Sequence, residues 1–353
     1  MGQPFITNLT RQERISYGLM LALLTMVGLL HLATLVIAAL FGYFALQCFT
    51  IKGRKGLAVA LYLLVAVGIL VGAYFFVRRA YQTLPGIAER TIPAVVDWAD
   101  QRGFDLPFSN LEEFKTVALE TVNKSFANIG FYLRRAMFQI VSLIIGVVMP
   151  VSLFLNARWH RDDDPLAVRG SLYSTVGQEL ALRVQTFYHS FTTVMGAQIL
   201  ISAINSVLTA AFLLWGGYQH VPVLVGLTFG CGLLPIVGNV ISNTLIVGVS
   251  FTIGPKMALF ALLFLVTIHK LEYFLNSKII GHRIKNPMWL TLFGLIIGER
   301  LMGIPGMILA PVVLHYIKVE ASRSRVADES APDETTEKKG EKLFEPELKS
   351  VNR

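Results

Sequence analysis

Residues 233–243 read LLPIVGNVISN and interrupt an otherwise apolar run, Val221–Thr252. Pro235 lacks a backbone N–H and Gly238 lacks a side chain, so this pair predicts a break between two helices. Each half would be about 20 Å long, too short to cross a hydrocarbon core about 30 Å thick. A helix that stops within lipid leaves backbone groups unpaired, so such breaks occur only against protein or a water-filled cavity. The run therefore predicts a re-entrant helical hairpin, residues 221–252.

A second broken segment lies further along the chain, at Trp289–Ile317. It contains GLIIGERLMGIPGMILAP, and we expect the Gly-Glu-Arg sequence at 298–300 to separate two half-helices. Pro305 and Pro311 are expected to bend the second half, because proline removes a helical hydrogen bond. The segment predicts a second re-entrant hairpin, residues 289–317.

The rest of the chain has the composition of a polytopic membrane protein. Of its 353 residues, 54% are apolar and only 15% are charged, against roughly 25% charged in ordinary soluble domains. We expect an all-α protein with about six to eight transmembrane segments, including the two hairpins. The range arises because the run Ser16–Phe49 is too long for one upright span and short for two.

The pattern of apolar and charged residues divides the chain into four regions. Ser109–Glu112 fits a capping box for an amphipathic helix that runs to about Arg135. After Ala321 the apolar periodicity is lost. The regions are N-terminal transmembrane segments at 1–77, an extramembrane or interfacial helical insert at 78–139, a core region at 140–318 that contains both hairpins, and a disordered cytoplasmic tail at 319–353.

The positions of Lys and Arg predict the topology. If both hairpins return to the side from which they enter, most of the short basic loops share one side, including Lys52–Lys55 and the acid-free KIIGHRIK sequence at 278–285. Lys256 then lies in a short loop on the other side. The positive-inside rule makes the basic side, with both termini, cytoplasmic. We attribute the formal charge of +8 to these loops and expect no nucleic-acid partner.

Residues 269–276, HKLEYFLN, place charged groups in a membrane helix. His269, Glu272 and Asn276 share a face at i, i+3 and i+7. On one interpretation this face lines a polar path, and Glu272 accepts a proton or coordinates a cation. On the other, Lys270 extends to the lipid headgroups, and Glu272 pairs with a basic residue of the following loop.

The break of the first hairpin supplies further candidates: Pro235, Gly238, Asn239 and Asn243. Broken helices present free backbone groups that transporters use to bind ions and polar solutes. Asn239 and Asn243 are one turn apart, so their amides could converge on such a ligand. Alternatively, Asn239 only caps the second half-helix.

The break of the second hairpin contains Glu299 and Arg300, followed by Gly303, Pro305 and Gly306. A charged pair at membrane depth needs partners, and the glycines could let this segment act as a gate. The alternative is a plain interfacial turn.

Gln198 and Asn205 lie two turns apart on the apolar run Phe191–Trp215. They could contribute to a polar path, or they could join helices through interhelical hydrogen bonds.

The sequence contains no HExxH, GxSxG or GxxxxGK[ST] motif. This counts against a zinc membrane protease, an esterase and an ATP-driven pump. We expect no enzymatic activity, no cofactor and no metal site.

The two broken segments together resemble a known family. LLPIVGNVISN, followed by LEYFLNSKIIGHRIKNPMWLTLFGLIIGERLMGIPGMILAPV at 271–312, is similar to the C-terminal signature of the autoinducer-2 exporter family, or PerM-like permeases. The resemblance covers roughly residues 16–318 and implies a multi-pass transporter of the bacterial inner membrane, with 140–318 as the core transport region. It also implies homopentameric assembly and an elevator-like motion.

The resemblance leaves the cargo open. It implies export of a small polar solute such as an autoinducer-2-like molecule, or Na⁺(Li⁺)/H⁺ antiport, as in other members. A membrane scaffold or assembly protein without transport is the alternative of another class. The expected partners are membrane lipids, the solute or ion, and further copies of the chain.

Overall fold

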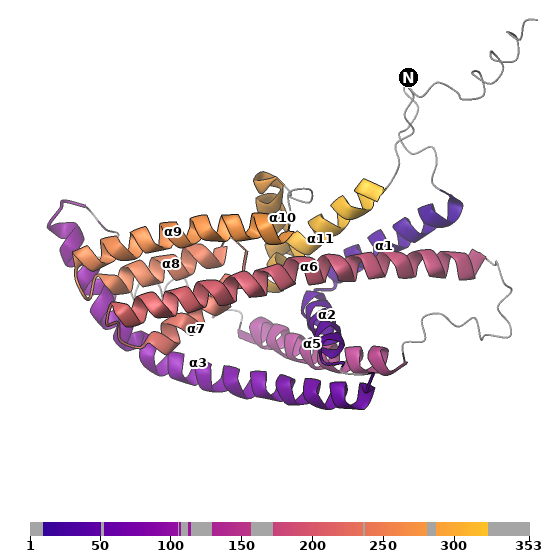
Figure 1. Cartoon of the computed structure of the whole chain (residues 1–353), viewed down its shortest axis with the longest axis horizontal. Coiled ribbons are helices and arrows are strands. Elements are labelled where there is room, and N and C mark those ends of the chain that lie inside the picture. The colour runs from indigo at the N-terminus through magenta and orange to yellow at the C-terminus, as the bar shows by residue number, and fades with distance from the viewer. Residues whose placement is uncertain are drawn as a thin grey trace, which may run out of the picture.

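The computed structural model describes residues 10–50, 53–104, 106, 112–113, 129–156, 172–235, 237–280 and 287–323. These residues form ten helices and no strand, which confirms the all-α prediction. The helices, labelled as in Figure 1, are α1 (Arg11–Leu29), α2 (Ala33–Cys48), α3 (Lys55–Asp100), α5 (Ile129–Asn156), α6 (Leu172–Trp215), α7 (Val221–Gly232), α8 (Val237–Ser250), α9 (Pro255–Ile280), α10 (Met288–Met302) and α11 (Ile304–Arg323).

Four helices within the described ranges are long and apolar enough to cross a membrane: α3, α5, α6 and α11. A fifth span results if α1 and α2 are taken together. The helices α7 and α8 are also apolar but are shorter. The chain is therefore a multi-pass helical membrane protein. The expected six to eight segments included the two hairpins, so the four or five full-length spans of the described residues do not decide that number.

The helix α6, 44 residues long, runs through the middle of the molecule (Figure 1). Phe187 and Phe191 in its first half and Met195 near its middle pack into a core cluster with residues of α1, α2 and α11. Phe212 and Leu213 in its second half pack into another cluster with residues of α3, α7, α8 and α9. A third cluster joins α2, α3 and α5. Both broken segments therefore pack against one central helix.

The long apolar run near the N-terminus is divided between two helices. A capping box starts α1, in which Glu13 N–H donates to Thr10 Oγ1 at 3.3 Å and Thr10 N–H donates to the Glu13 carboxylate at 2.7 Å. The direction of the chain then changes by 117° between α1 and α2. His31, in this break, has a φ of 55°, a left-handed conformation that is uncommon for a residue other than glycine.

The helix α3 continues well beyond the expected span. It is 46 residues long, contains Pro85 and Pro93, and measures about 69 Å. Only 11% of the most apolar stretch of α3, 18 residues long, is buried, whereas Ile87 and Val96 in the second half of the helix are buried. Helix α5 likewise runs across residue 139, so neither end of the expected insert coincides with a helix end. The predicted cap at Ser109 lies outside the described residues.

Helices α2 and α5 pack closely through two glycines. A β carbon on Gly146 would overlap Ala38, and one on Gly42 would overlap Pro150. Small residues at such positions let membrane helices approach each other. The Tyr62 hydroxyl of α3 donates to the Val147 carbonyl at 3.0 Å, one turn before the proline that interrupts the backbone bonding of α5.

Candidate functional site

The first broken segment forms a pair of short helices, α7 and α8, that pack on each other; residues 221–250 are called hairpin 1 below. Pro235 lies in the break, as predicted. Gly238 lies in the first turn of α8, where a β carbon would overlap the Cys231 carbonyl. Gly238 therefore allows the two halves to cross closely. The break itself is closed by turn bonds, including Leu234 N–H to the Cys231 carbonyl at 2.8 Å.

Side chains of α6 bond to carbonyls at the end of α7. Gln198 donates from Nε2 to the Gly232 carbonyl at 2.5 Å. Ser202 donates from Oγ to the Phe229 carbonyl at 2.8 Å. The last carbonyls of a helix have no partner within that helix, and in lipid each unpaired group costs several kcal/mol. The α6 side chains therefore stabilise the break of hairpin 1.

A direct polar contact joins hairpin 1 to α9. Asn239 donates from Nδ2 to Glu272 Oε2 at 2.7 Å, although the two residues are 33 positions apart. Both side chains are half-buried. The contact uses one N–H of the Asn239 side-chain amide. The side-chain oxygen Oδ1 of Asn239 and the second carboxylate oxygen of Glu272 can therefore accept further hydrogen bonds. These groups could accept hydrogen bonds from a hydroxylated solute or coordinate a cation.

A polar face of α6 extends this site. Gln198, Ser202, Asn205 and Thr209 recur at intervals of three or four residues, so they lie on one side of the helix. Asn205 is 6% exposed, and its Oδ1 has no hydrogen-bond donor among the described residues. Buried polar groups are expensive in a membrane protein and mark functional sites or interhelical contacts.

The other candidates of this region lie apart from the contact. Asn243 is half-buried one turn after Asn239 in α8, while His269 and Lys270 are exposed on α9. The side chain of Asn276 lies outside the described residues. Of the three residues predicted to form a polar face on α9, Glu272 is therefore the one with a described contact to hairpin 1.

The second broken segment, called hairpin 2 (residues 288–323), breaks later than predicted. Helix α10 continues through Gly298 and ends at Gly303, whose φ is 69°. A β carbon on Gly298 would overlap the Gly306 carbonyl, and one on Gly306 would overlap the Gly298 carbonyl. The expectation of a break at 298–300 was therefore wrong, because Gly298 permits close packing of α10 on α11 within an unbroken helix.

The later position of the break also changes where the charged residues and prolines of hairpin 2 lie. Glu299 and Arg300 are exposed in the last turn of α10. Pro305 occupies the first turn of α11, where its missing N–H costs no helical bond. It therefore does not bend the helix, whereas Pro311 lies inside α11.

The two breaks lie beside the middle part of α6. Gln198 contacts the break of hairpin 1. Met302, next to the break of hairpin 2, packs against the core cluster that includes Met195. Helices α7 and α11 both pack on α6, and Figure 1 shows α11 reaching α6 near its middle. The break of hairpin 1 and the break of hairpin 2 thus lie beside neighbouring turns of α6.

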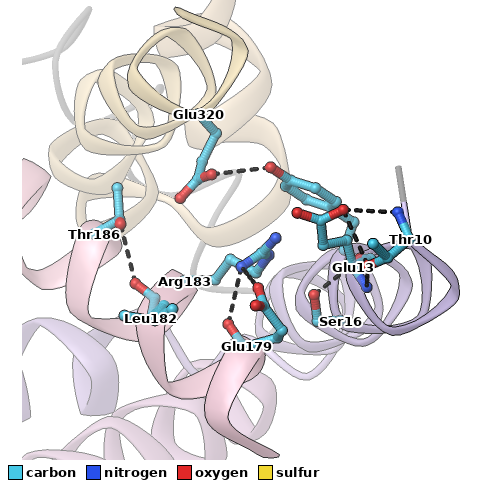
Figure 2. A network of polar contacts seen from close by, with 9 residues as sticks. Thr10, Glu13, Ser16, Glu179, Leu182, Arg183, Thr186 and Glu320 are labelled. Atoms are coloured by element: carbon cyan, nitrogen blue, oxygen red, sulfur yellow. Dashed lines mark hydrogen bonds and ion pairs between the residues drawn. The ribbon is translucent and has the colours of Figure 1, made fainter. Parts of the chain in front are cut away.

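A second polar cluster was not predicted. Figure 2 shows Arg183 of α6 among groups from three helices; the Arg183 cluster is Tyr17, Glu179, Arg183 and Glu320. The apolar run of α6 begins only near Phe191, so the length of that run does not place Arg183 in a membrane helix. The i,i+4 spacing of Glu179 and Arg183, typical of paired charges on a helix, could have shown that the helix starts earlier.

Within the described residues, no group of three or more His, Cys, Asp or Glu side chains could hold a metal ion. The chemistry that the site offers is hydrogen bonding by amides and hydroxyls and one carboxylate, Glu272.

Two comparisons relate the chain to known proteins. A family model described as "AI-2E family transporter" matches residues 14–323. Over 289 residues the chain is 27% identical to a Bacillus subtilis (strain 168) protein named "Putative transport protein YdbI", covering 79% of this chain and 80% of that protein. The residues matched by the family model include both hairpins and all of α6 and α9.

Proposed function

Because the chain belongs to the AI-2E transporter family, we propose that it is a secondary transporter of the bacterial inner membrane that carries a small polar solute, such as an autoinducer-2-like molecule. The solute passes the break of hairpin 1, where α6 and α9 supply polar side chains. Family membership supports the transporter class, and the geometry of hairpin 1 supports this location.

The contact between Asn239 and Glu272, 2.7 Å long, is the observation that carries this proposal. It places an amide and a carboxylate together at a helix break in an apolar protein. Broken helices with nearby polar groups are the usual binding sites of secondary transporters. A solute with hydroxyl groups replaces Asn239 as a donor to Glu272 and satisfies the carboxylate during passage.

A flux assay on purified protein in proteoliposomes tests the proposal. Glu272→Gln keeps the size of the side chain and removes its charge. We expect an autoinducer-2 flux about ten- to a hundredfold lower than that of the parent protein, with unchanged expression, because charge-assisted hydrogen bonds contribute about 1.5–3 kcal/mol. Glu89→Gln, at an exposed position of α3, is the matched control. Equal flux in the two variants would remove Glu272 from the solute path.

Glu272 also favours a second candidate, Na⁺(Li⁺)/H⁺ antiport, because a carboxylate can exchange a proton for a cation. A pH-sensitive dye inside the same vesicles distinguishes the two functions. Dye response to added Na⁺ without autoinducer-2 flux would support antiport. If the parent protein catalyses neither process, a scaffold or assembly role becomes the better explanation.

A further inference from the structure

The Arg183 cluster joins the first, the central and the last described helix. Arg183 donates from Nη1 to the Glu179 carboxylate at 2.6 Å, and its guanidinium lies 4.3 Å from the centroid of the Tyr17 ring in α1. The Tyr17 hydroxyl donates to Glu320 Oε2 of α11 at 3.1 Å (Figure 2). One guanidinium, one phenol and one carboxylate therefore connect α6, α1 and α11.

This cluster lies within packed protein. Arg183 is 6% exposed and Glu320 is 9% exposed. Beside them, Tyr316 of α11 makes an edge-to-face contact with Phe187 of α6, with ring centroids 5.6 Å apart. A buried guanidinium is stable only when it is paired and hydrogen-bonded. Arg183 is paired with Glu179 of its own helix, its Nε has no hydrogen-bond partner among the described residues, and its guanidinium reaches α1 through the Tyr17 ring. The Tyr17 ring therefore links Arg183 to α1, and the Tyr17 hydroxyl links α1 to Glu320 of α11.

The cluster holds one end of hairpin 2. Helix α11 begins next to Gly303, where hairpin 2 breaks, and Glu320 lies about 26 Å further along the same helix. Near the break, Gly298 and Gly306 hold α11 closely on α10. A continuous helix fixed at its far end limits the positions that its near end can take.

We propose that Arg183 is a positioning residue, which holds α11 on α1 through Tyr17 and Glu320 and thereby sets how far the break of hairpin 2 at Gly303 is exposed. None of these side chains belongs to the proposed solute site. The transport readout of the inference rests on the proposed function, whereas the labelling readout described next does not.

The substitution Tyr17→Phe tests the proposal, because it keeps the ring under Arg183 and removes the hydroxyl that bonds to Glu320. Cys48→Ala and Cys231→Ala remove the free cysteines of the described residues, and Met302→Cys places a reporter thiol beside the break. We expect Tyr17→Phe to raise the rate of maleimide labelling at position 302 by about two- to tenfold, the effect of losing one partly buried hydrogen bond. The maximal transport rate should change by a similar factor, with KM unchanged.

Tyr173→Phe is the matched control, because Tyr173 lies on the same helix as Arg183 and is 87% exposed. Its labelling rate should equal that of the parent. A second variant, Arg183→Lys, keeps the charge but loses the flat guanidinium over Tyr17, so it should also raise the labelling rate.

A lower melting temperature for Tyr17→Phe with unchanged labelling at position 302 would overturn the proposal, because the cluster would then be structural only. Unchanged labelling in Arg183→Lys would also contradict it. Absence of flux in the parent protein would contradict the proposed function alone, because the labelling experiment needs no solute.

Discussion

Gly238 determines how closely the two halves of hairpin 1 approach each other. A β carbon there would overlap the backbone carbonyl of Cys231, which cannot move aside as a flexible side chain could. We expect Gly238→Ala to lower the free energy of unfolding by about 1–3 kcal/mol, as overpacking does in other proteins. It should also lower the transport rate, because the shift falls next to Asn239. Thermal melting in detergent and vesicle flux measure the two effects.

Gly230 offers a control in the same hairpin. It lies inside α7, and a β carbon there would meet open space. Gly230→Ala should leave the melting temperature unchanged or raise it slightly, because alanine favours helix by up to about 1 kcal/mol over glycine. Similar losses of stability in the two variants would show that the crossing at Gly238 does not limit packing.

Single residues also show what the sequence could and could not predict. The residue types and their helical phase identified Glu272 and Asn239 as candidates. Their mutual contact was not predictable, because it depends on which helices lie side by side. The same limit applied to Gly298. A glycine in an apolar run is compatible with a break or with close packing, and only the position of Gly306 decides between them.

At the scale of the helix pair, hairpin 1 makes a topological prediction. Helix α7 begins directly after His220, and α8 ends at Ser250. If the hairpin is re-entrant, single cysteines introduced by His220→Cys and Thr252→Cys lie on the same side of the membrane. In a background without Cys48 and Cys231, we expect a membrane-impermeant maleimide to label both from the periplasmic side.

Ser322→Cys provides the opposite reference, because Ser322 is exposed near the end of α11 and is expected on the cytoplasmic side. It should be labelled only in inverted vesicles. Labelling of positions 220 and 252 from opposite sides would mean that α7 and α8 together cross the membrane once.

Helix ends were harder to predict than helical character. The turn between α1 and α2 contains His31 with a positive φ, and neither glycine nor proline lies in Leu30–Leu32 to indicate it. The bend accompanies the packing of α1 on α6 and of α2 on α5. Conversely, the N-terminal membrane segments were expected to end at residue 77, yet α3 continues to Asp100 and its buried positions, such as Ile87 and Val96, continue at helical spacing. Tertiary contacts decided both cases.

For the molecule as a whole, we predict that the C-terminal tail is dispensable. The packed helices end with α11 at Arg323, and residues 326–353 contain few apolar side chains to bury. Truncation after Arg325 should leave the melting temperature and the transport rate unchanged. Both are measurable on purified protein in detergent and in vesicles.

A shorter chain that ends at Ile317 is the informative comparison. It loses Glu320 and with it the bond from Tyr17, so it should melt at a lower temperature than the chain that ends at Arg325. If the two truncations melt alike, the end of α11 contributes little to stability. If truncation after Arg325 already impairs transport, the tail has a role of its own.

The polar face of α6 has a mechanical consequence. Gln198, Ser202, Asn205 and Thr209 are spaced along α6 like the rungs of a ladder, about 5 Å apart. Gln198 and Ser202 donate to the carbonyls of hairpin 1, and the Asn205 side-chain amide, one turn further along, also carries N–H donors. If hairpin 1 slid along α6 by one turn, each of its carbonyls would pass from one donor of α6 to the next and would remain hydrogen-bonded. A large displacement of hairpin 1 along α6 would thus be divided into steps of one helical turn, each with its carbonyls hydrogen-bonded.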